Sequence, residues 1–252
     1  MNFIQINLSN IESEHICCAI GNDKINQKRA HTKKEWLKER FNEGLVFERL
    51  NERGKVFIEY MPIEKVWKPI IGKNYMVINC LWVSGQFKGK GFARELLNKC
   101  INDAKSKKMV GVAVVTSTKI KPLLTDKKFY LKHGFEVVDS AFPYFELLAL
   151  KFDKNAENPH FTENAKSGKC KNKNGFCFVY SNQCPFIEEY VSMFDRICKS
   201  NNIPSEVIKL KSYKEAQEYG SPFGTLGVYY NGEFKTHEIM TEEKFLKFIE
   251  TL

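Results

Sequence analysis

The feature that most constrains the fold is a glycine-containing loop between an apolar run and an amphipathic stretch. The segment INCLWVSGQFKGKGFARELL covers residues 78–97 and places Gly89 and Gly91 in a basic loop. A strand, a short glycine loop and a helix can bind phosphate, because the first helical amides lack partners and this helix end favours anions. Without a Cβ, a glycine lets the backbone approach an oxyanion closely. The loop is either a phosphate site or a flexible surface corner, and its surroundings decide between them.

Two other phosphate-binding motifs do not fit this loop. The pattern G-x-x-x-x-G-K-[ST] of the P-loop is absent from the chain. The dinucleotide pattern G-x-G-x-x-G requires a third glycine where this sequence has Arg94.

The composition indicates a folded chain with thiols rather than disulfides. A hydrophobic fraction of 43% over 252 residues supports one large domain or two ordinary ones. No run approaches the roughly 20 apolar residues that span a bilayer, and the first residues do not resemble a signal peptide. We therefore expect a cytoplasmic protein without membrane contact, whose eight cysteines are mostly reduced. Because the cysteines are irregularly spaced and no CxxC occurs, no metal site is predicted.

The formal net charge of +9 favours an anionic partner such as a phosphorylated cofactor. A lysine-rich host proteome would produce the same value. No nucleic-acid motif accompanies the charge, so a nucleic-acid partner is not favoured.

The pattern of elements divides the chain at a polar segment. Residues 1–152 alternate between strands and helices, with helices expected at 10–20, 31–44, 92–108 and 125–135 and Thr32 as an N-cap. Strands are expected at 45–50, 55–61, 75–83, 109–117 and 144–152. Residues 153–174 are rich in Asn and Lys and are predicted to be a linker. Residues 175–252 have the order β-α-β-α-β-β-α of a thioredoxin-like domain, with a hairpin at Asn231-Gly232 and a last helix capped by Thr241.

The loop resembles motif A of the GNAT N-acetyltransferases, Q/R-x-x-G-x-G/A, which it matches at Gln86, Gly89 and Gly91, with Ala93 following. The preceding strand, the following helix and the later FYLKHGF (129–135) agree with this family over residues 1 to about 150. Stretches such as PFGTLGVYYNGEFKTHE are similar to acetyltransferases with a YoaP-like C-terminal domain. The resemblance implies a mixed α/β (α+β) fold, with a GNAT-type sheet covered on both faces by helices and a smaller α/β domain after it.

The resemblance also implies an acetyl-coenzyme A-dependent N-acetyltransferase that transfers the acetyl group directly to an amine. Its pantetheine would bind along the backbone of Leu81, Trp82 and Val83. The amides of the loop would bind its pyrophosphate, with these residues: Gln86, Phe87, Lys88, Gly89, Lys90, Gly91, Phe92 and Ala93. Tyr130 lies where the family often places the acid for the thiolate, and an ordinary tyrosine is protonated at neutral pH. A packed aromatic side chain is the alternative for Tyr130.

The general base is less clear from the sequence. Glu59 in VFIEYMP and Glu64 lie on or just after a strand that can flank the cofactor cleft, although a solvent-facing carboxylate is the alternative for both. Asn79 and Cys80 on the central strand are candidates for the acceptor site, with Cys80 as a nucleophile only a minor option.

Cys184-Pro185 lies between a strand and a helix, where thioredoxin-like domains place a reactive thiol whose pKa is lowered by the helix N-terminus. Ile187 occupies the resolving position, so no local dithiol is available. A thiol-active or acyl-coenzyme A-sensing regulator that uses Cys184 is the alternative function. The acceptor amine, a small molecule or a peptide, and the oligomeric state, a homodimer included, stay open.

Overall fold

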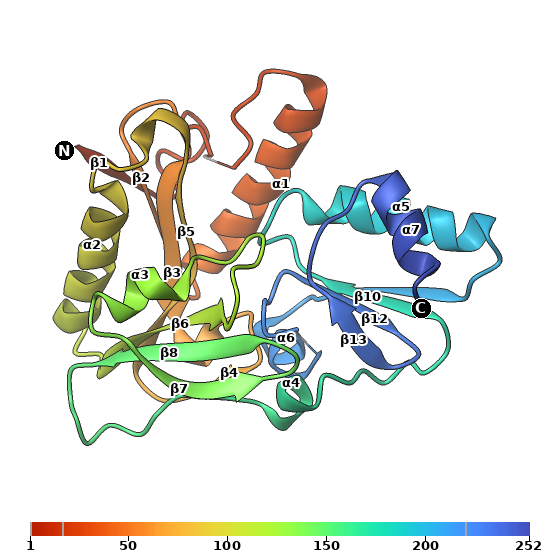
Figure 1. Cartoon of the computed structure of the whole chain (residues 1–252). Helices are drawn as coiled ribbons and strands as arrows, with labels where there is room; N and C mark the ends of the chain where they lie inside the picture. The colour runs from red at the N-terminus through yellow and green to blue at the C-terminus, as the bar shows by residue number, and fades with distance from the viewer. Residues whose placement is uncertain (1, 17, 220) are drawn as a thin grey trace.

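The computed structural model describes residues 2–16, 18–219 and 221–252, which form two sheets with their helices and one short strand pair (Figure 1). The larger sheet has seven strands in the order β1-β2-β3-β5-β6-β8-β7. Its strands are β1 (Phe3–Ile6), β2 (Val46–Leu50), β3 (Val56–Pro62), β5 (Tyr75–Val83), β6 (Gly111–Ser117), β7 (Glu136–Ala141) and β8 (Phe145–Lys151). The pair β5–β6 is parallel and the other neighbours are antiparallel, so the predicted mixed sheet is confirmed.

Helices cover both faces of this sheet, as the sequence predicts. Helix α1 (Lys24–Phe41) packs Trp36 and Leu37 into one buried cluster. Helix α2 (Phe92–Ser106) packs Leu96 and Leu97 into a second cluster on the opposite face, and α3 (Lys127–Leu131) adds Tyr130 there. The apolar stripe of α2 has the spacing of a helix that faces a core.

A β-bulge interrupts the centre of the sheet. Glu59 is opposite Cys80 and Tyr60 is opposite Ile78, so Asn79 is the extra residue on β5. On its other side, β5 pairs with β6 only as far as Ile78, opposite Val114, although both strands continue. A bulge increases the local twist and leaves its extra residue unpaired. The two parallel strands therefore diverge beyond the bulge and leave a wedge between them.

The C-terminal sheet has the order β11-β10-β12-β13, with β10 and β11 parallel. The predicted sequence of elements is observed: β10 (Phe176–Tyr180), α5 (Ile187–Ser200), β11 (Ser205–Lys209), α6 (Tyr213–Tyr219), β12 (Leu226–Tyr230), β13 (Glu233–Thr236) and α7 (Glu242–Ile249). Thr241 caps α7 by accepting from the Lys244 amide, as predicted. The thioredoxin-like assignment stays a prediction.

Two local predictions are wrong, and one strand was not predicted. The described residues between 10 and 20 form turns rather than a helix, and Cys17 lies outside the described residues. Helix α1 begins at Lys24, because the Asp23 side chain accepts from the Asn26 amide at 2.9 Å, and Thr32 lies inside the helix. Strand β7 was not expected, because as an edge strand it exposes much of its length, including Val137.

The segment 153–174, predicted to be a linker, contains β9 (His160–Phe161) and α4 (Glu163–Ser167). Strand β9 pairs with β4 (Ile70–Ile71), which follows the short 3-10 helix η1 (Ile63–Lys65). One continuous buried cluster includes side chains of both sheets, and the rings of Phe145 and Phe234 lie 5.7 Å apart. The two halves of the chain therefore share a core.

No helix in the described part of the chain has the length and apolar character needed to span a bilayer.

Lys68 joins the two halves from a fully buried position. It is 2% exposed, and its ammonium donates to the Phe223 carbonyl and lies 5.7 Å from the centre of the Phe223 ring. Burial lowers the pKa of Lys68 to about 8, because the charged form is poorly solvated there.

We expect Lys68 to make the free energy of unfolding depend on pH. Its pKa is about 8 when folded against an ordinary value of 10.5, so the unfolded chain binds more protons between these values and stability rises with pH there. Relative to Lys68→Met, the wild type should gain about 2 kcal/mol between pH 7 and pH 9.5, measured by urea denaturation. Exposed Lys73→Met is the control and should follow the wild type. Parallel curves for the wild type and Lys68→Met would contradict this assignment.

Candidate active site

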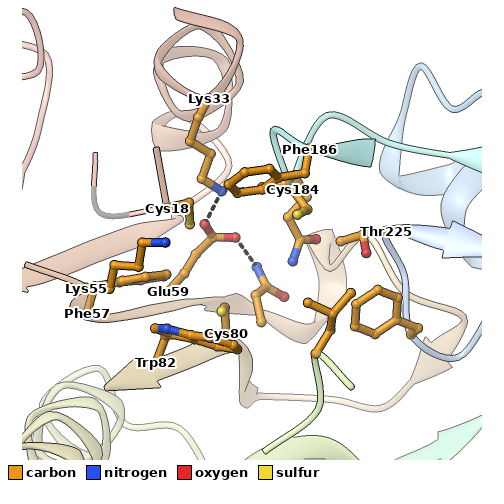
Figure 2. A pocket seen from close by; sticks show the side chains of 14 residues that line it. Cys18, Lys33, Lys55, Phe57, Glu59, Cys80, Trp82, Cys184, Phe186 and Thr225 are labelled. Atoms are coloured by element: carbon orange, nitrogen blue, oxygen red, sulfur yellow. Dashed lines mark hydrogen bonds and ion pairs between the residues drawn. The ribbon is translucent and has the colours of Figure 1, made fainter. Parts of the chain in front are cut away.

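A pocket of about 140 Å³ opens beside the bulge, between the larger sheet and the C-terminal half (Figure 2). Both halves of the chain contribute to its lining. The lining residues are Cys18, Lys33, Lys55, Phe57, Glu59, Asn79, Cys80, Trp82, Leu123, Gln183, Cys184, Phe186, Phe223 and Thr225.

Glu59 is the only carboxylate in this lining, and it is almost fully buried at 1% exposure. The Lys33 ammonium from α1 donates to one of its oxygens, and Asn79 Nδ2 donates to the other at 3.2 Å (Figure 2). Lys33 also donates to the backbone carbonyl of Gln183 at 2.6 Å. The bulge makes this possible, because it turns Asn79 to the same side of the sheet as Glu59.

Cys80 and Trp82 follow on the same strand and also line the pocket. Burial and the nearby Glu59 carboxylate raise the pKa of Cys80 to about 12. The thiol is therefore protonated at neutral pH, which argues against a nucleophilic role.

Tyr130 lies in a small cavity within the wedge, together with Asn79, Cys80, Leu81 and Thr125. Its hydroxyl is buried and makes no well-formed hydrogen bond to a described residue, although the Thr125 side chain lies within its reach. The Thr125 hydroxyl lies in the same cavity but donates to the Leu81 carbonyl at 3.2 Å. Burial raises the pKa of Tyr130, so the phenol keeps its proton. A buried donor without a well-formed hydrogen bond is unusual and is suited to a ligand that enters the wedge.

The glycine loop has the geometry of an anion site. The short 3-10 helix η2 (Gly85–Phe87) leads to Gly89 and Gly91, whose φ angles are +75° and +85°. No atom lies within 4 Å of where a Cβ would stand at either glycine. Among the residues that the structure describes, the backbone amides from 89 to 94 have no acceptor, and α2 has no side-chain cap. These amides and the open space fit a pyrophosphate.

The side chains of the loop divide into anchors and exposed groups. Phe87 and Phe92 are buried, with ring centres 5.8 Å apart, so they fix the loop and offer only their amides. Gln86, Lys88 and Lys90 are exposed. Next to the loop, the segment from Leu81 to Val83 has β3 on one side and the wedge on the other, which suits a ligand that lies along the strand.

Two sequence candidates have surroundings that differ from those expected. Glu64 is exposed on η1, outside the pocket lining, and its carboxylate accepts from the Asn74 amide at 2.7 Å. Cys184 does line the pocket, but burial raises its pKa despite the hydrogen bond from the Phe186 amide. The expected lowering of the Cys184 pKa is therefore wrong, and the thiol-active alternative is not favoured.

Sequence reasoning missed Lys33, Gln183, Phe186 and Phe223. Lys33 had a signal, because it lies at the spacing of Trp36, Leu37 and Arg40 on the buried face of α1. A lysine on an apolar stripe requires a buried partner. The other three are distant in sequence, and no local pattern marks them.

Comparisons with known proteins identify two families that the chain matches. Residues 10–135 match the Acetyltransferase (GNAT) family, and residues 204–247 match the YoaP-like family. The chain is 43% identical over its whole length, and over the whole relative, to the Uncharacterized N-acetyltransferase YoaP of Bacillus subtilis (strain 168).

Similar solved structures include the PaiA N-acetyltransferase of Thermoplasma acidophilum in complex with coenzyme A (17% identity, 60% of this chain, 100% of that chain, TM-score 0.42). A ribosomal-protein-alanine N-acetyltransferase of Brucella melitensis is another (15% identity, 60% of this chain, 100% of that chain, TM-score 0.43). With the family match and the full-length relative, the chain belongs to the GNAT family of acetyltransferases and is an acetyl-coenzyme A-dependent acyltransferase.

Proposed function

We propose that this protein transfers an acetyl group directly from acetyl-coenzyme A in the wedge to an amine in the pocket beside Glu59. One observation carries the proposal: Asn79 and Cys80 line both cavities, so the two sites meet across one segment of β5. Reactants held side by side need no acyl-enzyme, and orientation alone contributes much of the rate.

When bound, acetyl-coenzyme A supplies an acyl group activated as a thioester. Its pyrophosphate would be held by the amides from Gln86 to Ala93, and its pantetheine by the backbone from Leu81 to Val83. The exposed Lys88 and Lys90 add positive charge beside those amides.

The proton transfers are assigned to two groups. Glu59 accepts the proton of the acceptor amine, because it is the only carboxylate of the pocket lining. As the new bond to the amine nitrogen forms and the thioester C–S bond breaks, Tyr130 would donate its proton to the departing coenzyme A thiolate, because its hydroxyl stays protonated and lies in the wedge. Asn79 orients Glu59 by its 3.2 Å hydrogen bond.

We keep the division into an acetyltransferase domain at 1–152, a linker at 153–174 and a C-terminal domain at 175–252 as a proposal. It is supported by the separate sheets and by the two family matches. The cytoplasmic location and a homodimer stay predictions from the sequence.

Gly91→Ala should weaken coenzyme A binding by about tenfold, measured by calorimetry, because a Cβ at positive φ distorts the amides that receive the pyrophosphate. Gly232→Ala is the matched control, because its φ of +85° gives the same backbone strain in the turn between β12 and β13 of the C-terminal half. If both variants bind coenzyme A with equal affinity, the glycine loop is not part of the coenzyme A site.

Glu59→Gln should lower kcat/KM for the acceptor by about 10²-fold or more, the typical contribution of a general base. Glu64→Gln should leave kcat/KM unchanged, because Glu64 lies outside the pocket lining. Acetyl-coenzyme A turnover is followed by release of the free thiol.

A stability control is needed, because Glu59→Gln leaves Lys33 buried without its charge partner, which costs about 3–5 kcal/mol. The double variant Lys33→Met, Glu59→Gln removes both charges and should recover the free energy of unfolding but not the activity. Recovery of activity together with stability would show that Glu59 is only structural.

Tyr130→Phe should lower kcat by about 10²-fold while the KM for acetyl-coenzyme A changes little. The free energy of unfolding should fall by no more than about 1 kcal/mol, because the hydroxyl makes no well-formed hydrogen bond to a described residue. An unchanged kcat would identify Tyr130 as a packed aromatic side chain only.

A further inference from the structure

The C-terminal half of the chain forms one wall of the acceptor pocket, and two side-chain oxygens of that wall have no hydrogen-bond partner among the described residues. Gln183 and Thr225 are 5% and 4% exposed. Gln183 Oε1, Thr225 Oγ1 and, from β5, Asn79 Oδ1 are buried without a hydrogen-bond partner among the described residues. All three residues line the same pocket. Unpartnered oxygens gathered around one cavity indicate a ligand that donates hydrogen bonds.

We propose that the acceptor is a small amino acid with an apolar side chain, whose amine binds to these three oxygens, here called the oxygen cradle. This inference rests on the proposed acetyl transfer and specifies its substrate class. A primary ammonium carries three N–H donors, which matches the cradle, and Glu59 lies beside it to take the proton.

The size and lining of the pocket indicate what side chain the acceptor carries. Aromatic walls come from both halves: Phe57 and Trp82 on the larger sheet, and Phe186 and Phe223 opposite. The Arg29 guanidinium stacks on Phe186 at 4.6 Å and pairs with Glu189 at 2.7 Å, so this wall is held to α1. An apolar cavity of about 150 Å³ accommodates benzene, and this pocket of about 140 Å³ has room for a similar side chain.

The charges of the pocket define a second group on the acceptor. Lys33 is neutralised by Glu59, whereas Lys55 has no ion pair within the described part of the chain. The pocket therefore has one unbalanced positive charge, which attracts a carboxylate and repels a second ammonium. A polyamine fits poorly because the positive charge of Lys55 repels its second ammonium. An amino sugar fits poorly because the walls of the pocket are apolar.

Three acceptors of similar length test the class: leucine, 3-methylbutylamine, which is leucine without its carboxylate, and 1,5-diaminopentane. We expect kcat/KM to fall in that order, with leucine at least about tenfold above the amine that lacks the carboxylate. A preference for 1,5-diaminopentane, or equal values for the first two, would overturn the proposal.

Lys55→Met should raise the KM for leucine by about tenfold while the KM for 3-methylbutylamine and for acetyl-coenzyme A stays within about twofold. Lys73→Met is the control and should change none of them, because Lys73 is exposed and, like Lys55, has no ion pair in the described chain. A raised KM for acetyl-coenzyme A instead would assign Lys55 to the cofactor and overturn the carboxylate site.

Gln183→Met and Thr225→Val test the oxygen cradle with side chains of similar shape. Both should raise the KM for leucine about tenfold without lowering the melting temperature, because the removed oxygens have no partner among the described residues. Lys33 is unaffected in Gln183→Met, since it binds the backbone carbonyl. A drop in melting temperature with an unchanged KM would show that the oxygens are structural.

The proposed acetyl transfer and the proposed substrate class would be contradicted by different results. If no amine is acetylated at a rate that depends on Glu59, the proposed transfer itself is wrong. If transfer depends on Glu59 but the cradle and Lys55 variants leave the KM for leucine unchanged, only the substrate class is wrong.

Discussion

The buried ion pair between Lys33 and Glu59 is the interaction on which the site depends. It joins α1 to β3, and each partner makes one more bond: Glu59 to Asn79 on β5, and Lys33 to the Gln183 carbonyl of the C-terminal half. Two charges out of water are tolerated only when their remaining donors and acceptors are satisfied. Because these donors and acceptors must be satisfied, α1, the bulged strand β5 and the C-terminal half are held around the Glu59 carboxylate.

The bulge at Asn79 gives the proposed site its shape. The extra residue turns Asn79 towards Glu59, and beyond it β5 and β6 no longer pair. One face of the strand then borders the acceptor pocket, and its free edge borders the wedge with Tyr130. A regular sheet would keep β5 paired along its length and would leave no space for a ligand between the strands.

The C-terminal half is part of the site rather than an appended module. Its core is continuous with that of the larger sheet, and Lys68 and Lys33 both donate to its backbone carbonyls. Its side chains form a wall of the proposed acceptor pocket, so we expect changes in this half to alter which amine is acetylated. Specificity in the proposed reaction thus depends on residues far from the glycine loop.

The sequence alone determined the features that local rules govern. The strand, the positive-φ glycines and the helix of the glycine loop follow from neighbouring residues, as does the Thr241 cap, whereas the GNAT-type mixed sheet and the interest of Tyr130 came from the family resemblance. Local rules also produced errors where two signals compete, as at Asp23 and Thr32, both capping residues. Only the tertiary structure decided which glutamate is buried, because Glu59 and Glu64 have similar sequence surroundings but only Glu59 meets Lys33. The oxygen cradle and the aromatic wall join residues more than 100 positions apart, and pairings at that distance depend on packing, which no local pattern encodes.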